Sequence, residues 1–413
     1  MQYKTLSTWL RSIATIFAAV LFLTSARAAD HLTVPYNFEE PATSSLIRDA
    51  AGNLYGTGED GNRCGDDPCG LVYELSPVEG GGWTKTVLYN FNGTTAHGPN
   101  GLVMDAAGNL YGMTFSGGLY GGGTAYELSR GEGGGWTETV LYNFSSGSHF
   151  GYANYTLWRD AAGNLYGTTL DGGTYGAGMV FELSSSGGGA WTETVLWSFG
   201  NGSDGEYPES GVIMDAAGNL YGTTLQGGTY CQACGIVYEL SPSQGGNWSE
   251  TVLHNFNEND GWEPWASLIL DAAGNLYGTT GGGGAYSEGI AFEVSPHDGG
   301  WTETVLHSFG NGNDGSFLQA PLILDPTGNL FGTTQGGGTN HSGIVFELSP
   351  RQGGWIETVL YDFGNGGGFP LGGVVMDRAG DLYGTTESGG LYHEGTAYEL
   401  TPPAIRPGVS SLH

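Results

Sequence analysis

Three short loops combine Asp, Asn and Gly in a pattern that could coordinate calcium. Asp204, Asp260 and Asp314 lie within Asn-Gly-Ser-Asp-Gly, Asn-Glu-Asn-Asp-Gly and Asn-Gly-Asn-Asp-Gly. Ca²⁺ takes oxygen ligands from Asp and Asn in loops of this composition, so these carboxylates are candidate calcium ligands. Each segment is shorter than a complete calcium loop and has no bidentate Glu at a fixed later position. A solvated turn is therefore the competing interpretation, and we expect no other cofactor.

Aromatic side chains in a second set of loops predict a carbohydrate site. Most of them stand eight residues before an Asp that recurs seven times in the chain, and Pro41 and Glu263 occupy this position in the two remaining copies. Trp262 and Trp265 lie in the fifth of these loops and have no counterparts in the others. A flat ring can stack on the apolar face of a sugar, so a neutral carbohydrate is the expected ligand. Packing between repeats is the alternative. The candidate ligand-binding residues are Trp262, Trp265, Tyr207, Tyr152, His97, Phe317 and Phe369.

The histidines do not complete a recognised catalytic set, because Gly-x-Ser-x-Gly, His-Glu-x-x-His and P-loop motifs are all missing from the sequence. His254 and His307 replace Tyr at a repeated strand position, and we interpret them as packing residues. Four histidines lie in loops: His97, His149, His341 and His393. With Tyr152 or Tyr155 they could supply acid and base to an enzyme of the polysaccharide-lyase or lactonase type. We favour a non-catalytic binding or scaffold protein, and keep this enzyme as the alternative.

A tandem repeat positions all of these residues. The pattern Asp-x-x-Gly-Asn/Asp-Leu-Tyr/Phe-Gly recurs at intervals of 52 to 56 residues, starting at Asp49, Asp105, Asp160, Asp215, Asp271, Asp325 and Asp377. The signatures Tyr/Phe-Glu-Leu/Val and Thr-Val-x-x-x-Phe keep step with it. Each unit contains four short, turn-bounded strand segments, which is typical of one propeller blade. The sequence therefore predicts an all-β, seven-bladed β-propeller of four-stranded antiparallel blades.

The order of the signatures predicts how the ring closes. The segment from Leu32 to Phe38 is a fourth-strand signature without its preceding strands, whereas the last repeat ends at Leu400 without a fourth strand. We expect the N-terminal strand to complete the last blade, which removes the open sheet edges. The three apolar residues before each repeated Asp predict an innermost strand that is buried on both faces. The loops between strands two and three, and between blades, share one face, which we take as the functional face.

Charge and the N-terminal residues indicate an exported protein. Lys4 and Arg11, the apolar run from Ile13 to Leu23, and Ala26-Arg27-Ala28 fit a signal peptide over residues 1–28. We assign residues 29–400 to the propeller and 401–413 to a tail. The 42 acidic and 11 basic residues, with a net charge of −31, exclude a basic nucleic-acid footprint. No later segment is long and apolar enough to span a membrane. We expect a secreted monomer, extracellular or periplasmic, that binds a neutral carbohydrate or an extracellular protein.

The repeat units resemble a known family. Asp-x-x-Gly-Asn-Leu-Tyr-Gly-Thr-Thr, Gly-Gly-x-x-x-x-Gly and Trp-Thr-Glu-Thr-Val-Leu-Tyr-x-Phe are similar to the GloVer (Gloeo/Verruco) tandem repeats of exported bacterial proteins, over about residues 32 to 400. The resemblance implies a repeat architecture and no assigned reaction.

The four cysteines form two local pairs. Cys64 and Cys69 share one loop of the first repeat, and Cys231 and Cys234 share one loop of the fourth. Export favours disulfides over a reduced zinc site, and two cysteines without nearby partners are an incomplete ligand set. We therefore expect the disulfides Cys64–Cys69 and Cys231–Cys234.

Overall fold

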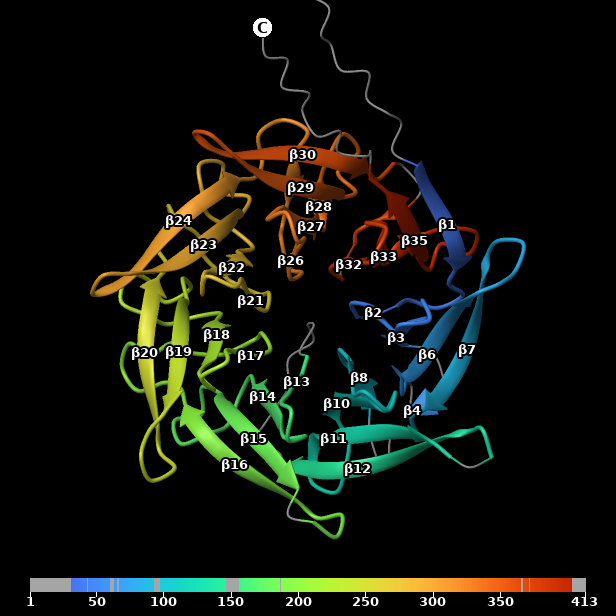
Figure 1. The fold of residues 1–413 in the computed structure, drawn as a ribbon, viewed down its shortest axis with the longest axis horizontal. Helices are drawn as coiled ribbons and strands as arrows, with labels where there is room; N and C mark the ends of the chain where they lie inside the picture. The colour runs from blue at the N-terminus through green and yellow to red at the C-terminus, as the bar shows by residue number, and fades with distance from the viewer. Residues whose placement is uncertain are drawn as a thin grey trace, which may run out of the picture.

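The structure, a computed structural model, is a ring of β-sheets around a central axis (Figure 1). It describes residues 31–402 except 43, 60–62, 65–66, 93–96, 132, 146–155, 186, 365–366 and 371. These residues form seven antiparallel blades and no helix, so the predicted fold class is confirmed. Within the same residues there is no helix long and apolar enough to cross a membrane.

The first three blades follow each other along the chain. Blade 1 consists of β2 (Ile47–Arg48), β3 (Leu54–Gly58), β6 (Leu71–Pro77) and β7 (Trp83–Asn90). Blade 2 consists of β9 (Val103–Met104), β10 (Leu110–Ser116), β11 (Gly121–Arg130) and β12 (Trp136–Ser145), and β8 (His97–Pro99) also pairs with β10. Blade 3 consists of β13 (Trp158–Arg159), β14 (Leu165–Thr169), β15 (Met179–Ser185) and β16 (Trp191–Ser198).

The next three blades repeat this order from the inside of the ring outward. Blade 4 consists of β17 (Ile213–Met214), β18 (Leu220–Thr224), β19 (Ile236–Pro242) and β20 (Trp248–Asn255). Blade 5 consists of β21 (Ile269–Leu270), β22 (Leu276–Thr279), β23 (Ile290–His297) and β24 (Gly300–Ser308). Blade 6 consists of β26 (Ile323–Leu324), β27 (Leu330–Thr334), β29 (Ile344–Arg351) and β30 (Gly354–Asp362).

Blade 7 combines the two ends of the described chain. It consists of β32 (Val375–Met376), β33 (Leu382–Thr386), β35 (Thr396–Thr401) and, on the outside, β1 (His31–Asn37). β1 pairs antiparallel with β35, with Leu32 opposite Leu400. Three small two-stranded sheets lie in the loops. β4 (Arg63–Cys64) and β5 (Asp67–Pro68) form a hairpin, whereas β25 (Gly315–Ser316) pairs with β28 (Gly336–Gly337) and β31 (Gly367–Gly368) pairs with β34 (Ser388–Gly389) across the inner strands of their blades.

The prediction that the innermost strands are buried on both faces is wrong. β17 and β21 are only half-buried, whereas the second strand of the same blades, β18 and β22, is buried at every position. The innermost strands are two residues long and lie next to the axis of the ring, so no further strand covers their inner side. The outer strands alternate between half-buried and exposed residues along much of their length.

One aromatic contact joins each blade to the next. A Phe near the end of every outer strand is buried, and its ring meets an aromatic ring on the third strand of the following blade. The seven contacts are Phe38–Tyr73, Phe91–Tyr126, Phe144–Phe181, Phe199–Tyr238, Phe256–Phe292, Phe309–Phe346 and Phe363–Tyr398. Their centroids lie 4.9–5.5 Å apart, within the range of favourable aromatic pairs.

The repeated Gly of the second strand makes room for that third-strand ring. Gly278 lies opposite Phe292 in the ladder between β22 and β23. A Cβ atom on Gly278 would collide with the ring of Phe292 and with Leu268. The repeat therefore requires glycine at this position for packing, and not for a turn.

The repeated Asp has a structural role in the turn between the first and second strands. In blade 5, Asp271 Oδ1 accepts the amides of Ala273 and Asn275 at 2.8 and 2.9 Å, while Oδ2 accepts the Asn275 side chain and the Tyr277 hydroxyl. Burial acts to raise the pKa of Asp271, but these hydrogen bonds outweigh it and lower the pKa. The carboxylate is thus held in the turn between β21 and β22.

We expect Phe256→Ala to destabilise the protein by about 3–5 kcal/mol, because it removes a fully buried ring from the junction between blades 4 and 5. Ile356→Ala, at an exposed position of β30, is the control and should change the free energy of unfolding by only about 0.5 kcal/mol. Urea denaturation measures both. Equal effects of the two substitutions would contradict the assigned role of the aromatic contact.

Candidate functional site

The predicted aromatic positions between blades have a left-handed backbone. Tyr207, Phe317 and Phe369 have φ of 58°, 56° and 57°, and Glu263 at the same repeat position has φ of 55°. Phe317 N donates to Glu288 O of the preceding blade, and Phe317 O accepts from Gln335 N of its own blade. The residues Phe317 and Phe369 are 52% and 40% exposed. A bulky residue in this conformation is strained, so two backbone hydrogen bonds hold an exposed ring in place at a cost.

Trp262 and Trp265 lie against glycine. Both are half-buried, and Cβ atoms on Gly282 and Gly281 would collide with their indole groups. Trp262 also packs against the buried cluster between blades 4 and 5. Burial raises the pKa of Glu263, and a hydrogen bond from the Trp265 side chain opposes this shift. Both readings made from the sequence, stacking and packing, remain predictions, since neither ring is fully exposed nor fully buried.

The other loop residues are spread over several blades. His97 lies in β8, and its Nδ1 is 3.1 Å from Ser116 Oγ. His341 and His393 lie in loops of blades 6 and 7. Tyr152, His149 and Tyr155 fall outside the described residues, so their predicted roles stay predictions.

The three candidate calcium ligands lie in successive interblade loops, and each ends a turn of its own. Asp204 Oδ1 accepts the amides of Gly200 and Asn201 at 3.1 and 2.8 Å. Asp260 accepts the amide and the side chain of Asn257, and Asp314 accepts the amide of Gly310. Among the described residues, no group of potential metal ligands contains two of the three aspartates. Calcium binding at the single loops remains a prediction.

The structure also reveals a repeated site that the sequence analysis overlooked. Two residues before the junction Phe, each outer strand carries a side chain that faces the next blade. At the first two junctions it is a Tyr whose hydroxyl donates to a Glu, from Tyr89 to Glu138 at 2.7 Å and from Tyr142 to Glu193 at 3.0 Å. In blades 3, 4 and 5 this position is occupied by Trp197, His254 and His307.

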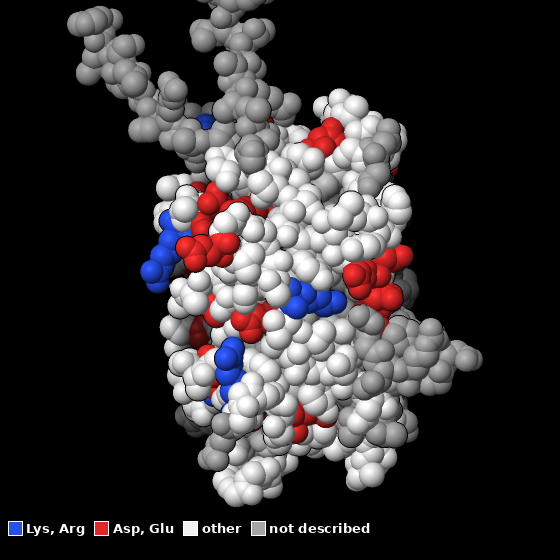
Figure 2. Space-filling view, turned by 90° about the vertical axis from the view of Figure 1, so that its right-hand side faces the viewer, with Lys and Arg blue, Asp and Glu red and all other residues white. Residues whose placement is uncertain are grey.

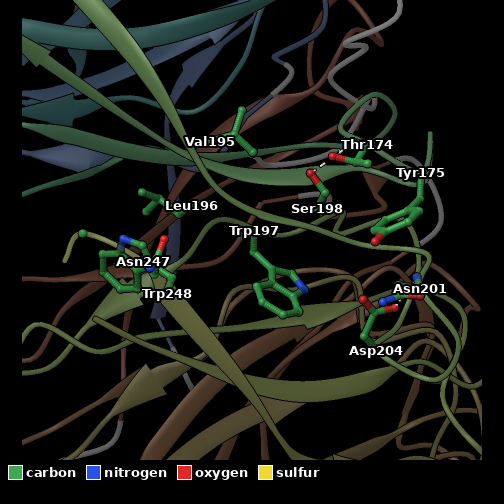
Figure 3. Close-up of a pocket in the computed structure, with 11 residues that line it drawn as sticks. Thr174, Tyr175, Val195, Leu196, Trp197, Ser198, Asn201, Asp204, Asn247 and Trp248 are labelled. Atoms are coloured by element: carbon green, nitrogen blue, oxygen red, sulfur yellow. Dashed lines mark hydrogen bonds between the residues drawn. The ribbon is translucent and has the colours of Figure 1, made fainter. Parts of the chain in front are cut away.

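Trp197 lies at the centre of a groove on the outer side of the junction between blades 3 and 4 (Figure 3). The groove has a volume of about 420 Å³, within the range of small-ligand sites. Figure 3 shows Tyr175 with Asn201 and Asp204 toward one end and Trp248 with Asn247 toward the other. Three aromatic side chains thus alternate with carboxylate and amide groups. The residues that line the groove are Thr174, Tyr175, Val195, Leu196, Trp197, Ser198, Asn201, Asp204, Gly246, Asn247 and Trp248.

Several buried polar atoms next to this groove have free hydrogen-bonding capacity. Within the described part of the chain, Trp197 Nε1, Asp204 Oδ2 and Glu250 Oε1 are buried and have no hydrogen-bond partner. Burial raises the pKa of Glu250 to about 8, and the negative charge of Asp204 adds to the shift. One indole donor and two carboxyl oxygens thus have unused hydrogen-bonding capacity beside the groove.

The disulfides belong to the loops between second and third strands. Cys231 and Cys234, between β18 and β19, form a disulfide with their Cα atoms 5.3 Å apart. Cys69 is fully buried and is also disulfide-bonded. The side chain of Cys64 lies outside the described residues, so its pairing with Cys69 stays a prediction.

The charged side chains are sparse on the face of the molecule that Figure 2 shows. Acidic and basic groups are separated there by large uncharged areas, and no continuous basic surface is seen on that face. This agrees with the exclusion of a nucleic-acid footprint from the net charge of −31.

Comparison with known proteins identifies the family. The model of the Gloeobacter/Verrucomicrobia repeat matches residues 15–234 and 211–412, so the chain belongs to this repeat family, as its motifs predicted. No curated protein gave a significant match. A solved structure, provisionally assigned as a gluconolactonase, aligns over 74% of this chain and 92% of its own, with 14% sequence identity and a TM-score of 0.41.

We expect Glu250 to lower the free energy of unfolding progressively as the pH rises from about 4.5 to 8. Its pKa is near 8 in the folded chain and 4.5 when exposed, so in this interval the folded state binds a proton that the unfolded state releases. Glu250→Gln should reduce the fall in the free energy of unfolding, measured by urea denaturation at pH 5 and pH 8. Glu258→Gln, at an exposed loop position, controls for the removed charge. Parallel pH profiles for wild type and Glu250→Gln would show that Glu250 titrates normally.

Proposed function

We propose that this protein is an exported, non-catalytic β-propeller that binds a neutral carbohydrate in the groove around Trp197. The observation that carries the proposal is the combination of Tyr175, Trp197 and Trp248 with the amide and carboxyl groups of Asn201 and Asp204. Aromatic faces match the apolar face of a pyranose ring, and buried donors and acceptors bind its hydroxyl groups. The excess of acidic residues favours an uncharged ligand over an anionic one.

The exposed loop aromatics support the same ligand class. Phe317 and Phe369 present half-exposed rings in a backbone conformation that costs free energy, and such strain concentrates at binding sites. We propose that they, together with Tyr207, Tyr152, His97, Trp262 and Trp265, form a second contact surface for a longer chain of sugars or for an extracellular protein. Membership in the repeat family and the disulfides support export, since disulfides persist in oxidising compartments.

The groove is tested with neutral gluco-, manno- and xylo-oligosaccharides in titration calorimetry. We expect Trp197→Ala to weaken the binding of the recognised oligosaccharide at least about tenfold, which corresponds to about 1.4 kcal/mol. Tyr142→Ala changes the same repeat position at another junction and is the matched control, which should leave the affinity unchanged. Trp265→Ala tests the loop surface separately, since this residue does not line the groove.

Three outcomes would contradict the proposal. The first is wild-type protein that binds none of these oligosaccharides, and the second is a Trp197→Ala variant that binds them as well as wild type does. Shortened or unsaturated products in the calorimeter cell would instead indicate the lyase or lactonase alternative.

A further inference from the structure

Two adjacent blade junctions carry the same trio of potential metal ligands. At the junction of blades 4 and 5 the trio is His254, Asp260 and Glu303, and at the junction of blades 5 and 6 it is His307, Asp314 and Glu357. Each residue of a trio offers one ligand atom, a ring nitrogen of His or a carboxylate oxygen, and the three ligand atoms lie within 4.8 Å of one another. The His comes from an outer strand, the Asp from the loop that follows it, and the Glu from the outer strand of the next blade.

The distances fit a small, four-coordinate cation. His254 Nε2 lies 3.6 Å from Asp260 Oδ2, and His307 Nε2 lies 3.1 Å from Asp314 Oδ2. Metal–ligand bonds of about 2.0–2.2 Å place two ligands of a tetrahedral Zn²⁺ about 3.3–3.6 Å apart. At 3.6 Å the first pair is too far apart for a hydrogen bond, although both groups are partly buried.

Two of the residues in the first trio have a buried polar atom that is not hydrogen-bonded within the described part of the chain. His254 Nε2 and Glu303 Oε1 are buried and have no hydrogen-bond partner among the described residues.

The chemistry of the ligands selects the cation. Ca²⁺ prefers six to eight oxygen ligands and Mg²⁺ prefers an octahedral oxygen set, whereas each trio offers one imidazole nitrogen and two carboxylates. Such a mixed set suits Zn²⁺, with water as the fourth ligand. We propose that the chain binds two Zn²⁺ ions, one in each trio, and that each ion joins two neighbouring blades.

The repeat supplies a substitution that removes the ligand and keeps the packing. Blades 1 and 2 carry Tyr89 and Tyr142 where blades 4 and 5 carry His254 and His307, and both Tyr hydroxyls donate to the Glu of the next blade. His254→Tyr and His307→Tyr should therefore fold normally. A third junction, with Trp197, Asp204 and Glu250, retains both carboxyl groups without a His and is the natural control within the same chain.

Titration of the untagged, chelator-treated protein with Zn²⁺ in a calorimeter tests the proposal. We expect two ions per wild-type chain, one in either single variant and none in the double variant, with at least about a hundredfold loss of affinity at each altered site. Zn²⁺ should also raise the melting temperature of wild type and leave that of the double variant unchanged.

The alternatives give different results. Unchanged zinc stoichiometry in the double variant would place the ions at other residues and overturn the proposal. Wild type that takes up no Zn²⁺, or that responds to Ca²⁺ and not to Zn²⁺, would also overturn it. Circular dichroism of each variant establishes that any loss of binding does not come from unfolding.

Discussion

The ring depends on the aromatic contact between a Phe near the end of each outer strand and the third-strand ring of the next blade. This contact is made at every junction, from Phe38–Tyr73 to Phe363–Tyr398. The third-strand ring in turn requires the glycine opposite it, as Gly278 lies opposite Phe292. The aromatic residue of the third strand and the glycine of the second strand therefore depend on each other, because a close-packed interior has no room for both a Cβ atom and the ring.

The same contact creates the positions where the blades differ. The residue two places before the junction Phe lies on the same strand, so its side chain is brought to the next blade whatever its chemistry. Tyr there forms a hydrogen bond to Glu, as in Tyr89–Glu138, and completes a structural junction. Trp197 replaces the Tyr beside an open groove, and His254 replaces it between two carboxylates. One scaffold position therefore supports packing, a candidate sugar site and a candidate metal site in different blades.

Sequence reasoning succeeded where a signal was repeated and local. The seven copies of the Asp turn predicted the blades, and the short spacing of Cys231 and Cys234 predicted a local disulfide. It missed the groove and the trios, since His254 and His307 were interpreted as packing residues and Trp197 was not singled out. A usable signal was present: both His254 and His307 are followed six or seven residues later by Asp, at the edge of a strand. The Glu that completes each trio lies in the next repeat, about fifty residues away, and no local pattern joins it to the His.

By itself, the sequence determined the all-β class, the number of blades, the turn chemistry and the excess of negative charge, because each depends on residue type and period alone. Only the tertiary structure decided which side chains meet across a junction, since that depends on how one blade packs on the next. It also decided that the two-residue inner strands are half-exposed and that Trp262 and Trp265 lie against Gly282 and Gly281. The tertiary structure also decided the burial of Glu250 and Glu303. The alternation of Glu with Thr along a strand predicts an exposed carboxylate, but a neighbouring blade covers it and raises its pKa.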